Sequence, residues 1–153
     1  MNKKDLLVVF NIFGHHANEN QQINSYKDSL HGIFKQISNA PQFSFRVVIS
    51  ACLVSDRCVE ELKKKFGEDI SIFRYVDRYT CQVASNKTIL KSIEYFHEEY
   101  EGYLYFSSGI FFAPDSEEIN DSFVISEHHV KTPVRTRIGN PKIFSNIVEK
   151  LKT

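Results

Sequence analysis

The sequence predicts an α/β fold in which helices cover both faces of a mainly parallel sheet. Short apolar runs rich in β-branched and aromatic residues alternate with longer segments whose apolar residues recur at helical spacing. The chain has 153 residues, enough for one domain whose single core needs no disulfide or metal. Strands that alternate with helices are joined by right-handed crossovers, which place the helices on the faces of a parallel sheet.

The first strand and helix are expected near the amino end. Residues 6–13, LLVVFNIF, form a continuous apolar run typical of a strand that is buried on both faces. This run is short and lacks a small-residue cleavage site, which argues against a signal peptide. After the polar stretch 14–22, apolar residues recur at helical spacing over 23–37, and the helix should end before Pro41.

The second unit repeats this pattern. Residues 43–53 predict another buried strand. The helix expected over 57–66 is capped by Ser55 or Asp56 and closed by Gly67.

A third unit leads to a fourth strand. We expect a strand at 70–76, a loop at 77–82, a helix over 83–100 and a strand over 102–112, GYLYFSSGIFF. The mostly apolar stripe of that helix comprises Val83, Lys87 or Thr88, Leu90, Ile93 or Glu94, and Phe96 or His97. The resulting β-α-β-α-β-α-β order is Rossmann-like, with three layers.

The pattern weakens after Pro114. We expect one helical turn at 115–119, a short strand at 122–126 and an irregular basic segment at 128–139. A final helix over 140–152 begins with an Asn-Pro pair and carries an apolar stripe.

Composition limits the function. Basic and acidic side chains number 19 each, which argues against a nucleic-acid partner held by a general positive surface. No apolar stretch approaches the ~18 residues of a membrane span. The three cysteines form no CxxC, and we read Cys52 and Cys58 as small buried side chains in a reducing compartment, the cytoplasm.

Common catalytic and binding motifs are absent from the sequence, including GxGxxG, GxxxxGK[ST], GxSxG and HExxH. The histidines at 15–16 and 128–129 would form a metal site only if the C-terminal segment folded back over the first strand, and otherwise they are exposed loop residues. The lysines at 63–65 are read as a solvated helix face.

Candidate site residues lie at the strand ends, because ligands of parallel α/β sheets bind outside the carboxyl ends of the strands. The apolar run of the fourth strand is interrupted by Ser-Ser-Gly, which marks either a bend or the edge of a site. Asn86 either caps a helix or reaches a ligand. The candidates are Asn11, Ala51, Asp77, Arg78, Asn86, Ser107, Ser108 and Gly109.

The strand–helix order around LLVVFNIF, RVVISACLVSDRCVEELKKKF, SIFRYVDRYTCQVASNKTILKSIEYF and EGYLYFSSGIFF resembles the nucleotide-sugar-binding half of GT-A fold glycosyltransferases, especially family 2-like enzymes. The resemblance spans residues 5–115. Asn86 matches the asparagine of the family's "arN" element. Ser107, Ser108 and Gly109 occupy the place of its metal-binding Asp-x-Asp motif.

This resemblance implies a UDP- or GDP-linked sugar as the donor and a hydroxyl as the acceptor. The family uses Mn²⁺ or Mg²⁺ to neutralise the diphosphate, but hydroxyls are poor ligands for these ions. Arg135 or Arg137 could take the place of the metal. The resemblance assigns no catalytic base.

The resemblance leaves open whether the family's second, acceptor-binding half is part of the protein. Residues 1–153 are expected to form one GT-A-like domain, either the N-terminal half of a longer enzyme or a minimal, degenerate member. An alternative is a non-catalytic binding or assembly module, since 13 phenylalanines and 7 tyrosines could leave an apolar patch for a partner domain or a second copy. A third alternative is an unrelated Rossmann-like nucleotide or phosphosugar enzyme.

Overall fold

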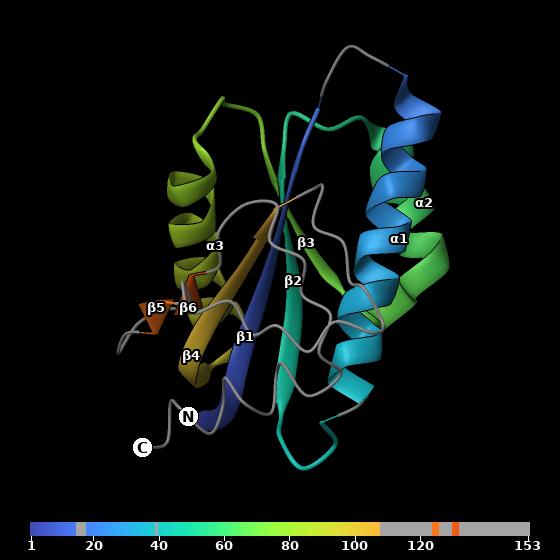
Figure 1. The fold of residues 1–153 in the computed structure, drawn as a ribbon. Coiled ribbons are helices and arrows are strands. Elements are labelled where there is room, and N and C mark those ends of the chain that lie inside the picture. The colour runs from blue at the N-terminus through green and yellow to red at the C-terminus, as the bar shows by residue number, and fades with distance from the viewer. Residues whose placement is uncertain (15–17, 39, 108–123, 126–129, 132–153) are drawn as a thin grey trace.

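The fold was analysed in a computed structural model, which describes residues 1–14, 18–38, 40–107, 124–125 and 130–131. It is an α/β fold in which a parallel sheet lies between layers of helices (Figure 1). The predicted Rossmann-like three-layer class is therefore confirmed.

Four parallel strands form the main part of the sheet, and two short strands extend it in the order β3-β2-β1-β4-β6-β5. The strands β1, β2 and β3 follow one another in one direction across the sheet, whereas β4 lies on the other side of β1. The strand order therefore reverses between β1 and β4. The strands are β1 (Asn2–Phe13), β2 (Phe45–Cys52), β3 (Ser71–Tyr75), β4 (Glu98–Ser107), β5 (Val124–Ile125) and β6 (Val130–Lys131).

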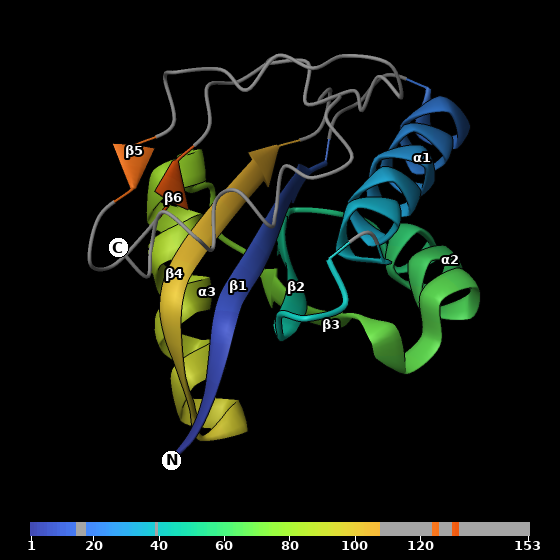
Figure 2. The same ribbon diagram turned by 60° about the horizontal axis from the view of Figure 1, so that its bottom comes forward.

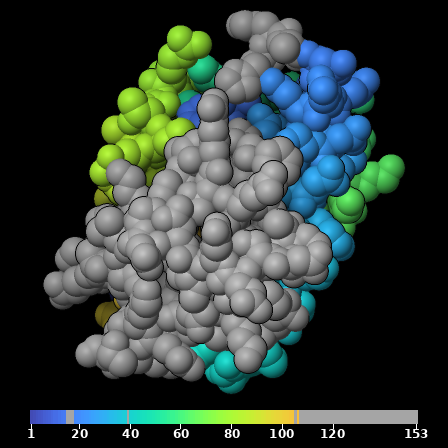
Figure 3. Space-filling view, viewed as in Figure 1, coloured from blue at the N-terminus to red at the C-terminus, as the bar shows by residue number. Residues whose placement is uncertain are grey.

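The long helices cover opposite faces of the sheet. Helices α1 (Glu19–Ser38) and α2 (Asp56–Phe66) lie on one face, and α3 (Cys81–Phe96) lies on the other (Figure 2). The space-filling view also places α1 and α3 on opposite flanks (Figure 3). A short 3₁₀ turn, η1 (Gly67–Asp69), links α2 to β3.

Two core clusters follow from the alternation of side chains along β1. Leu6, Val8, Phe10 and Ile12 are fully buried in the cluster under α1 and α2. The intervening Leu7 and Val9 belong to the cluster that packs on the α3 side. A strand buried on both faces needs a continuous apolar run, which is the pattern that predicted it.

The predicted stripe of α3 is right in part, because Thr88 is buried and Ile93 and Phe96 pack against the core cluster on the α3 side. The predicted Val83 and Leu90 are exposed, however, and apart from Ile89 the fully buried face consists of small or hydroxyl-bearing side chains. These hydroxyls can be buried because they bond within the helix: Ser92 Oγ donates to the Thr88 carbonyl at 2.6 Å. The buried residues are Ala84, Ser85, Thr88, Ile89 and Ser92.

The end of α3 also differs from the prediction. The helix was expected to reach residue 100, but it ends at Phe96 and His97 adopts a left-handed conformation with φ 52°. The segment from Glu98 pairs with the amino end of β1, where Asn2 faces Glu98 in register. Backbone pairing along an extended β1 therefore outweighs the helical pattern of 98–100.

Capping residues in the sequence set the other helix boundaries. Ser55 caps α2 by accepting from the Cys58 amide at 3.1 Å, and Gly67 closes the helix, as predicted. Thr80 caps α3, so that the helix begins inside the loop expected at 77–82. Of the short strand expected at 122–126, the structure describes Val124–Ile125, and these residues form β5.

The basic segment 128–139 was expected to be irregular, but it contains β6. The turn expected at 115–119 and the helix expected at 140–152 lie outside the described residues. Within them, no helix is long and apolar enough to cross a membrane.

The cysteines and the lysine run match their interpretations. All three thiols are free, with Cys52 and Cys58 buried and Cys81 exposed. The lysines at 63–65 are exposed on α2.

Candidate functional site

The carboxyl ends of the four long strands meet at one edge of the sheet. Phe13 of β1 lies in register with Cys52 of β2, which lies in register with Tyr75 of β3. On the other side of β1, Asn11 pairs with Ser107 of β4. The strand tips that the sequence selected therefore share an edge, where α/β sheets bind ligands.

A pocket of about 430 Å³ opens at this edge, beside the carboxyl ends of β1 and β2 and the amino ends of α1 and α2. Its apolar wall includes Phe13, Ile23 and Val54. Its polar lining includes Glu19, Gln22 and Arg78. Pockets for small molecules commonly have this volume and this combination of an apolar wall with a few polar groups.

Gly14 shapes the pocket through the backbone. Its amide donates to the Cys52 carbonyl at 2.9 Å, and a Cβ on Gly14 would lie 1.9 Å from the Leu53 carbonyl oxygen. Only glycine fits this close approach. Gly14, the first residue after β1, is thus held directly against the loop after β2.

Leu53 has a left-handed backbone, with φ 57°, and its amide donates to the Tyr75 carbonyl at 2.9 Å. Such a conformation costs a non-glycine residue on the order of 1–2 kcal/mol and occurs preferentially at ligand sites. Together with the Gly14 contact, this bond ties the tips of three strands together.

Glu19 links the starts of the two helices that border the pocket. Its carboxylate accepts a hydrogen bond from the Ser55 hydroxyl, and Arg57 Nη1 lies 3.4 Å from Glu19 Oε2. Asn18 caps α1 by accepting from the Gln21 amide at 3.2 Å. The pocket therefore presents a carboxylate held by a hydroxyl and a guanidinium.

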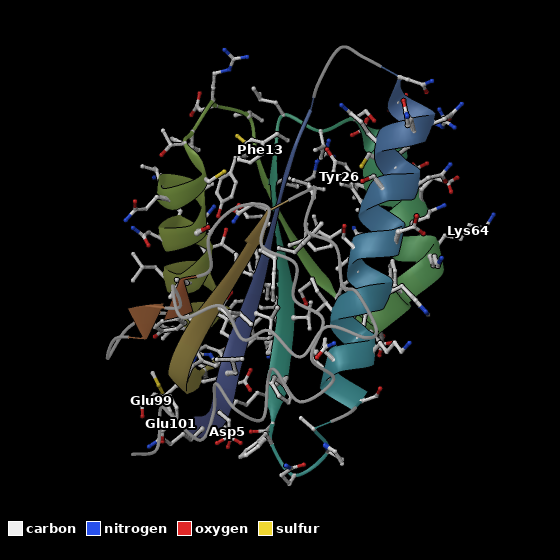
Figure 4. All side chains as sticks on the ribbon, viewed as in Figure 1. Asp5, Phe13, Tyr26, Lys64, Glu99 and Glu101 are labelled. Atoms are coloured by element: carbon white, nitrogen blue, oxygen red, sulfur yellow. The ribbon has the colours of Figure 1, made fainter. Side chains whose placement is uncertain are left out.

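The floor of the pocket is neutral. The Tyr26 hydroxyl donates to the Phe13 carbonyl at 2.7 Å, and Figure 4 shows Tyr26 between α1 and the sheet. Burial raises the pKa of Tyr26 to about 12 and that of Cys58 to about 11. Cys58 therefore remains a thiol near pH 7 and lacks the thiolate character of a nucleophile.

Arg78 is the predicted site residue that lines the pocket. It is exposed and forms no ion pair within the described part of the chain. The neighbouring Asp77 is also exposed and accepts from the Tyr79 hydroxyl at 3.2 Å, while its carbonyl accepts from Cys52 Sγ at 3.0 Å. Arg78 is thus available to an anion at the mouth of the pocket.

Asn11 lies on the α3 face and does not line the pocket. It is buried, and its Nδ2 donates to Ser85 Oγ of α3 at 2.7 Å and to the Phe106 carbonyl of β4 at 3.4 Å. Its Oδ1 has no hydrogen-bond partner among the described residues. In this structure Asn11 joins β1 to α3 and β4 at the point where the strand order reverses.

The remaining candidates are dispersed. Ala51 is fully buried in the cluster under α1 and α2, and Asn86 is exposed on α3. Ser107 ends β4 next to Asn11. Ser108 and Gly109 lie outside the described residues, as do Arg135, Arg137 and the paired histidines.

Two polar residues of the pocket, Glu19 and Gln22, were not among the predicted candidates. Glu19 and Gln22 belong to the polar stretch 14–22, which was read as a connection, although α1 begins inside it. An acidic residue in the first turn of a helix that follows a strand was the available signal.

The described residues do not provide a metal centre. They contain no group of three or more histidine, cysteine, aspartate or glutamate side chains that could hold an ion.

No family model, curated protein or solved structure matches this chain. The functional inference therefore depends on the fold and on the pocket at the carboxyl edge.

Proposed function

We propose that the chain binds a nucleotide at the carboxyl edge of its sheet, as the donor-binding domain of a glycosyltransferase-like protein would bind a nucleotide sugar. The main support is the pocket of about 430 Å³ at the carboxyl ends of β1 and β2. Its position is the one that α/β sheets use for ligands, and its lining combines apolar and polar groups.

The lining suits the parts of a nucleotide. Phe13, Ile23 and Val54 offer apolar surface to a planar base. Arg78 offers a guanidinium without a carboxylate partner in the described residues, and guanidinium groups bind phosphate with two parallel hydrogen bonds. A diphosphate would therefore extend from the pocket toward Arg78.

Glycosyl transfer is the part of the proposal that depends on the resemblance of residues 5–115 to GT-A enzymes. The donor would be a UDP- or GDP-linked sugar, and the acceptor a hydroxyl group. Arg78 would stabilise negative charge on the departing diphosphate. The general base that removes the acceptor proton is unassigned.

A reducing compartment, the cytoplasm, is part of the same proposal. Its support is that the three thiols are free and that two of them are buried as small core side chains.

Calorimetric titration with UDP, GDP and their sugars, with and without Mn²⁺, tests nucleotide binding. We expect dissociation constants from about 1 μM to a few millimolar, which correspond to binding free energies of about −8 to −4 kcal/mol. Failure of every compound to bind would contradict the proposal.

A pair of variants locates the site. Arg78→Ala removes the cation at the mouth of the pocket, whereas Lys64→Ala removes an exposed cation on α2 that does not line it (Figure 4). We expect Arg78→Ala to weaken binding about tenfold, the effect of one charge-assisted hydrogen bond, and Lys64→Ala to change it little. Equal effects would mean that the nucleotide binds elsewhere.

A non-catalytic binding or assembly module is the second candidate. It is favoured by the exposed apolar side chains Val83, Leu90 and Tyr95 on α3. If the chain bound a nucleotide sugar but neither transferred nor hydrolysed the sugar with any acceptor tested, this candidate would be preferred. A partner domain or a second copy could then cover α3.

A further inference from the structure

We infer that the pocket selects guanine nucleotides and that Glu19 is the residue that recognises the base. This inference rests on the proposed nucleotide binding and adds its substrate class. It begins with the charge inside the pocket. Among the described residues that line it, Glu19 is the one carboxylate and Arg78 the one cation.

Glu19 is held in place but still accessible. The Ser55 hydroxyl and the Arg57 guanidinium contact different oxygens of its carboxylate. An ionised carboxylate has about four acceptor sites on its two oxygens, so further hydrogen bonds can be accepted. The Glu19 side chain is 42 % exposed and can therefore meet a ligand.

This carboxylate also sets the direction of the ligand. The Arg57 guanidinium beside Glu19 is already paired with that carboxylate, and the carboxylate itself repels phosphate oxygens. Arg78 has no carboxylate partner among the described residues, so a phosphate is attracted to Arg78. The base therefore lies between the starts of α1 and α2, and the diphosphate lies toward Arg78.

The hydrogen-bonding edges of the bases then decide specificity. Guanine presents two adjacent donors, N1–H and the N2 amino group, which match the two oxygens of a carboxylate. Uracil presents one N–H between two carbonyl oxygens, and these oxygens repel a carboxylate. Adenine and cytosine place an unprotonated ring nitrogen beside their amino group, so that the second oxygen of Glu19 would face an acceptor.

Two other features fit the same base. Gln22 also lines the pocket, and its amide N–H can donate to O6, the acceptor next to N1 of guanine. Phe13, Ile23 and Val54 supply apolar surface for the purine ring. A site built to accept from two donors discriminates strongly against a base that lacks them.

The experiment compares the calorimetric affinities of GDP, IDP, UDP, ADP and CDP without divalent metal. IDP matters because hypoxanthine lacks only the 2-amino group. For the unmodified chain we expect GDP to bind at least about tenfold more tightly than UDP, and more tightly than IDP, as befits charge-assisted bonds. The IDP comparison needs no variant and holds whether or not a substitution disturbs folding.

Two matched variants assign the effect to Glu19. Glu19→Gln keeps the size of the side chain but replaces one acceptor oxygen by an amino group. Glu60→Gln removes a carboxylate from the exposed face of α2, outside the pocket lining. Glu19→Gln should lose the preference for GDP over IDP and UDP, and Glu60→Gln should retain it.

The outcomes separate the two proposals. Nucleotide binding without a guanine preference, or a preference that survives Glu19→Gln, overturns the inference and leaves the proposed function standing. If none of the five nucleotides binds, either without metal or when the titration is repeated with Mn²⁺, nucleotide binding itself fails and the inference fails with it.

Discussion

Gly14 shows how one residue can control the shape of the site. Because a Cβ there would lie 1.9 Å from the Leu53 carbonyl oxygen, Gly14→Ala must push the backbone of residue 14 away from the Leu53 carbonyl. Gly67 has φ 56° with no atom within 4 Å of an added Cβ, so Gly67→Ala would cost only backbone strain. We expect a loss of about 2–3 kcal/mol for Gly14→Ala and about 1 kcal/mol for Gly67→Ala.

Urea denaturation of both alanine variants measures the difference. Gly14→Ala should also weaken nucleotide binding, while Gly67→Ala should not. No loss of stability for Gly14→Ala would mean that Gly14 can move away from the loop after β2 without cost.

Cys58 leads to a prediction of how the stability of the fold depends on pH. Its pKa is raised from 9.0 to about 11, chiefly by burial. Between these pH values the unfolded chain releases the thiol proton while the folded chain retains it. The contribution of this pKa shift to the free energy of unfolding is therefore fully present below about pH 9 and is lost as the pH rises toward about 11.

The free energy of unfolding, measured from pH 7 to 10.5, should decline less steeply above pH 9 in Cys58→Ala than in the unmodified chain. The variant starts from a lower stability at pH 7 because a buried side chain is truncated. Parallel curves for the two proteins would show that Cys58 titrates alike in both states.

At the scale of elements, Glu98 joins three strands at the amino edge of the sheet. It is 2 % exposed and belongs to β4, while its cationic partners Lys4 and Arg46 come from β1 and β2. Lys4 Nζ lies 3.6 Å from Glu98 Oε2, and the Arg46 guanidinium also lies 3.8 Å above the ring of Phe96. The network fixes β4 beside β1 at the end opposite the pocket.

Glu98→Ala should therefore destabilise the fold by about 2–4 kcal/mol, because it leaves two partly buried cations without their acceptor. Glu99→Ala is the matched control, since Glu99 is exposed on the same strand (Figure 4). Chemical denaturation gives both values. A cost for Glu98→Ala no greater than that of the control would show that solvent screens the network completely.

The order of strands and helices could be read from the sequence, but the contact face of α3 could be read only in part. Continuous apolar runs identify strands buried on both faces, as 6–13 does. The contact face of α3 uses Ala84, Ser85 and Thr88, and a search for apolar periodicity does not detect such residues. Small side chains and hydroxyls that bond to their own helix can be buried without an apolar stripe.

At the scale of the whole molecule, the sequence predicted that the strand tips share one edge of the sheet, but not on which face of the sheet the pocket at that edge lies. A strand buried on both faces gives no signal for which side chains face which helix layer, so Asn11 was placed with the ligand although it faces α3. Glu19 was missed because polar residues at the start of a helix resemble a loop.

Hydrogen exchange can test on which side of the sheet a nucleotide binds. If a nucleotide occupies the pocket, saturating GDP should slow amide exchange in the described segments at 19–23 and 53–58, which border it. It should leave exchange at 98–102 little changed, because the amino end of β4 lies at the opposite edge of the sheet. Uniform slowing would indicate only global stabilisation by mass action. Slowing confined to α3 would place the ligand on the Asn11 side of the sheet, where Asn11 Oδ1 lacks a partner in the described structure, and would reassign the site.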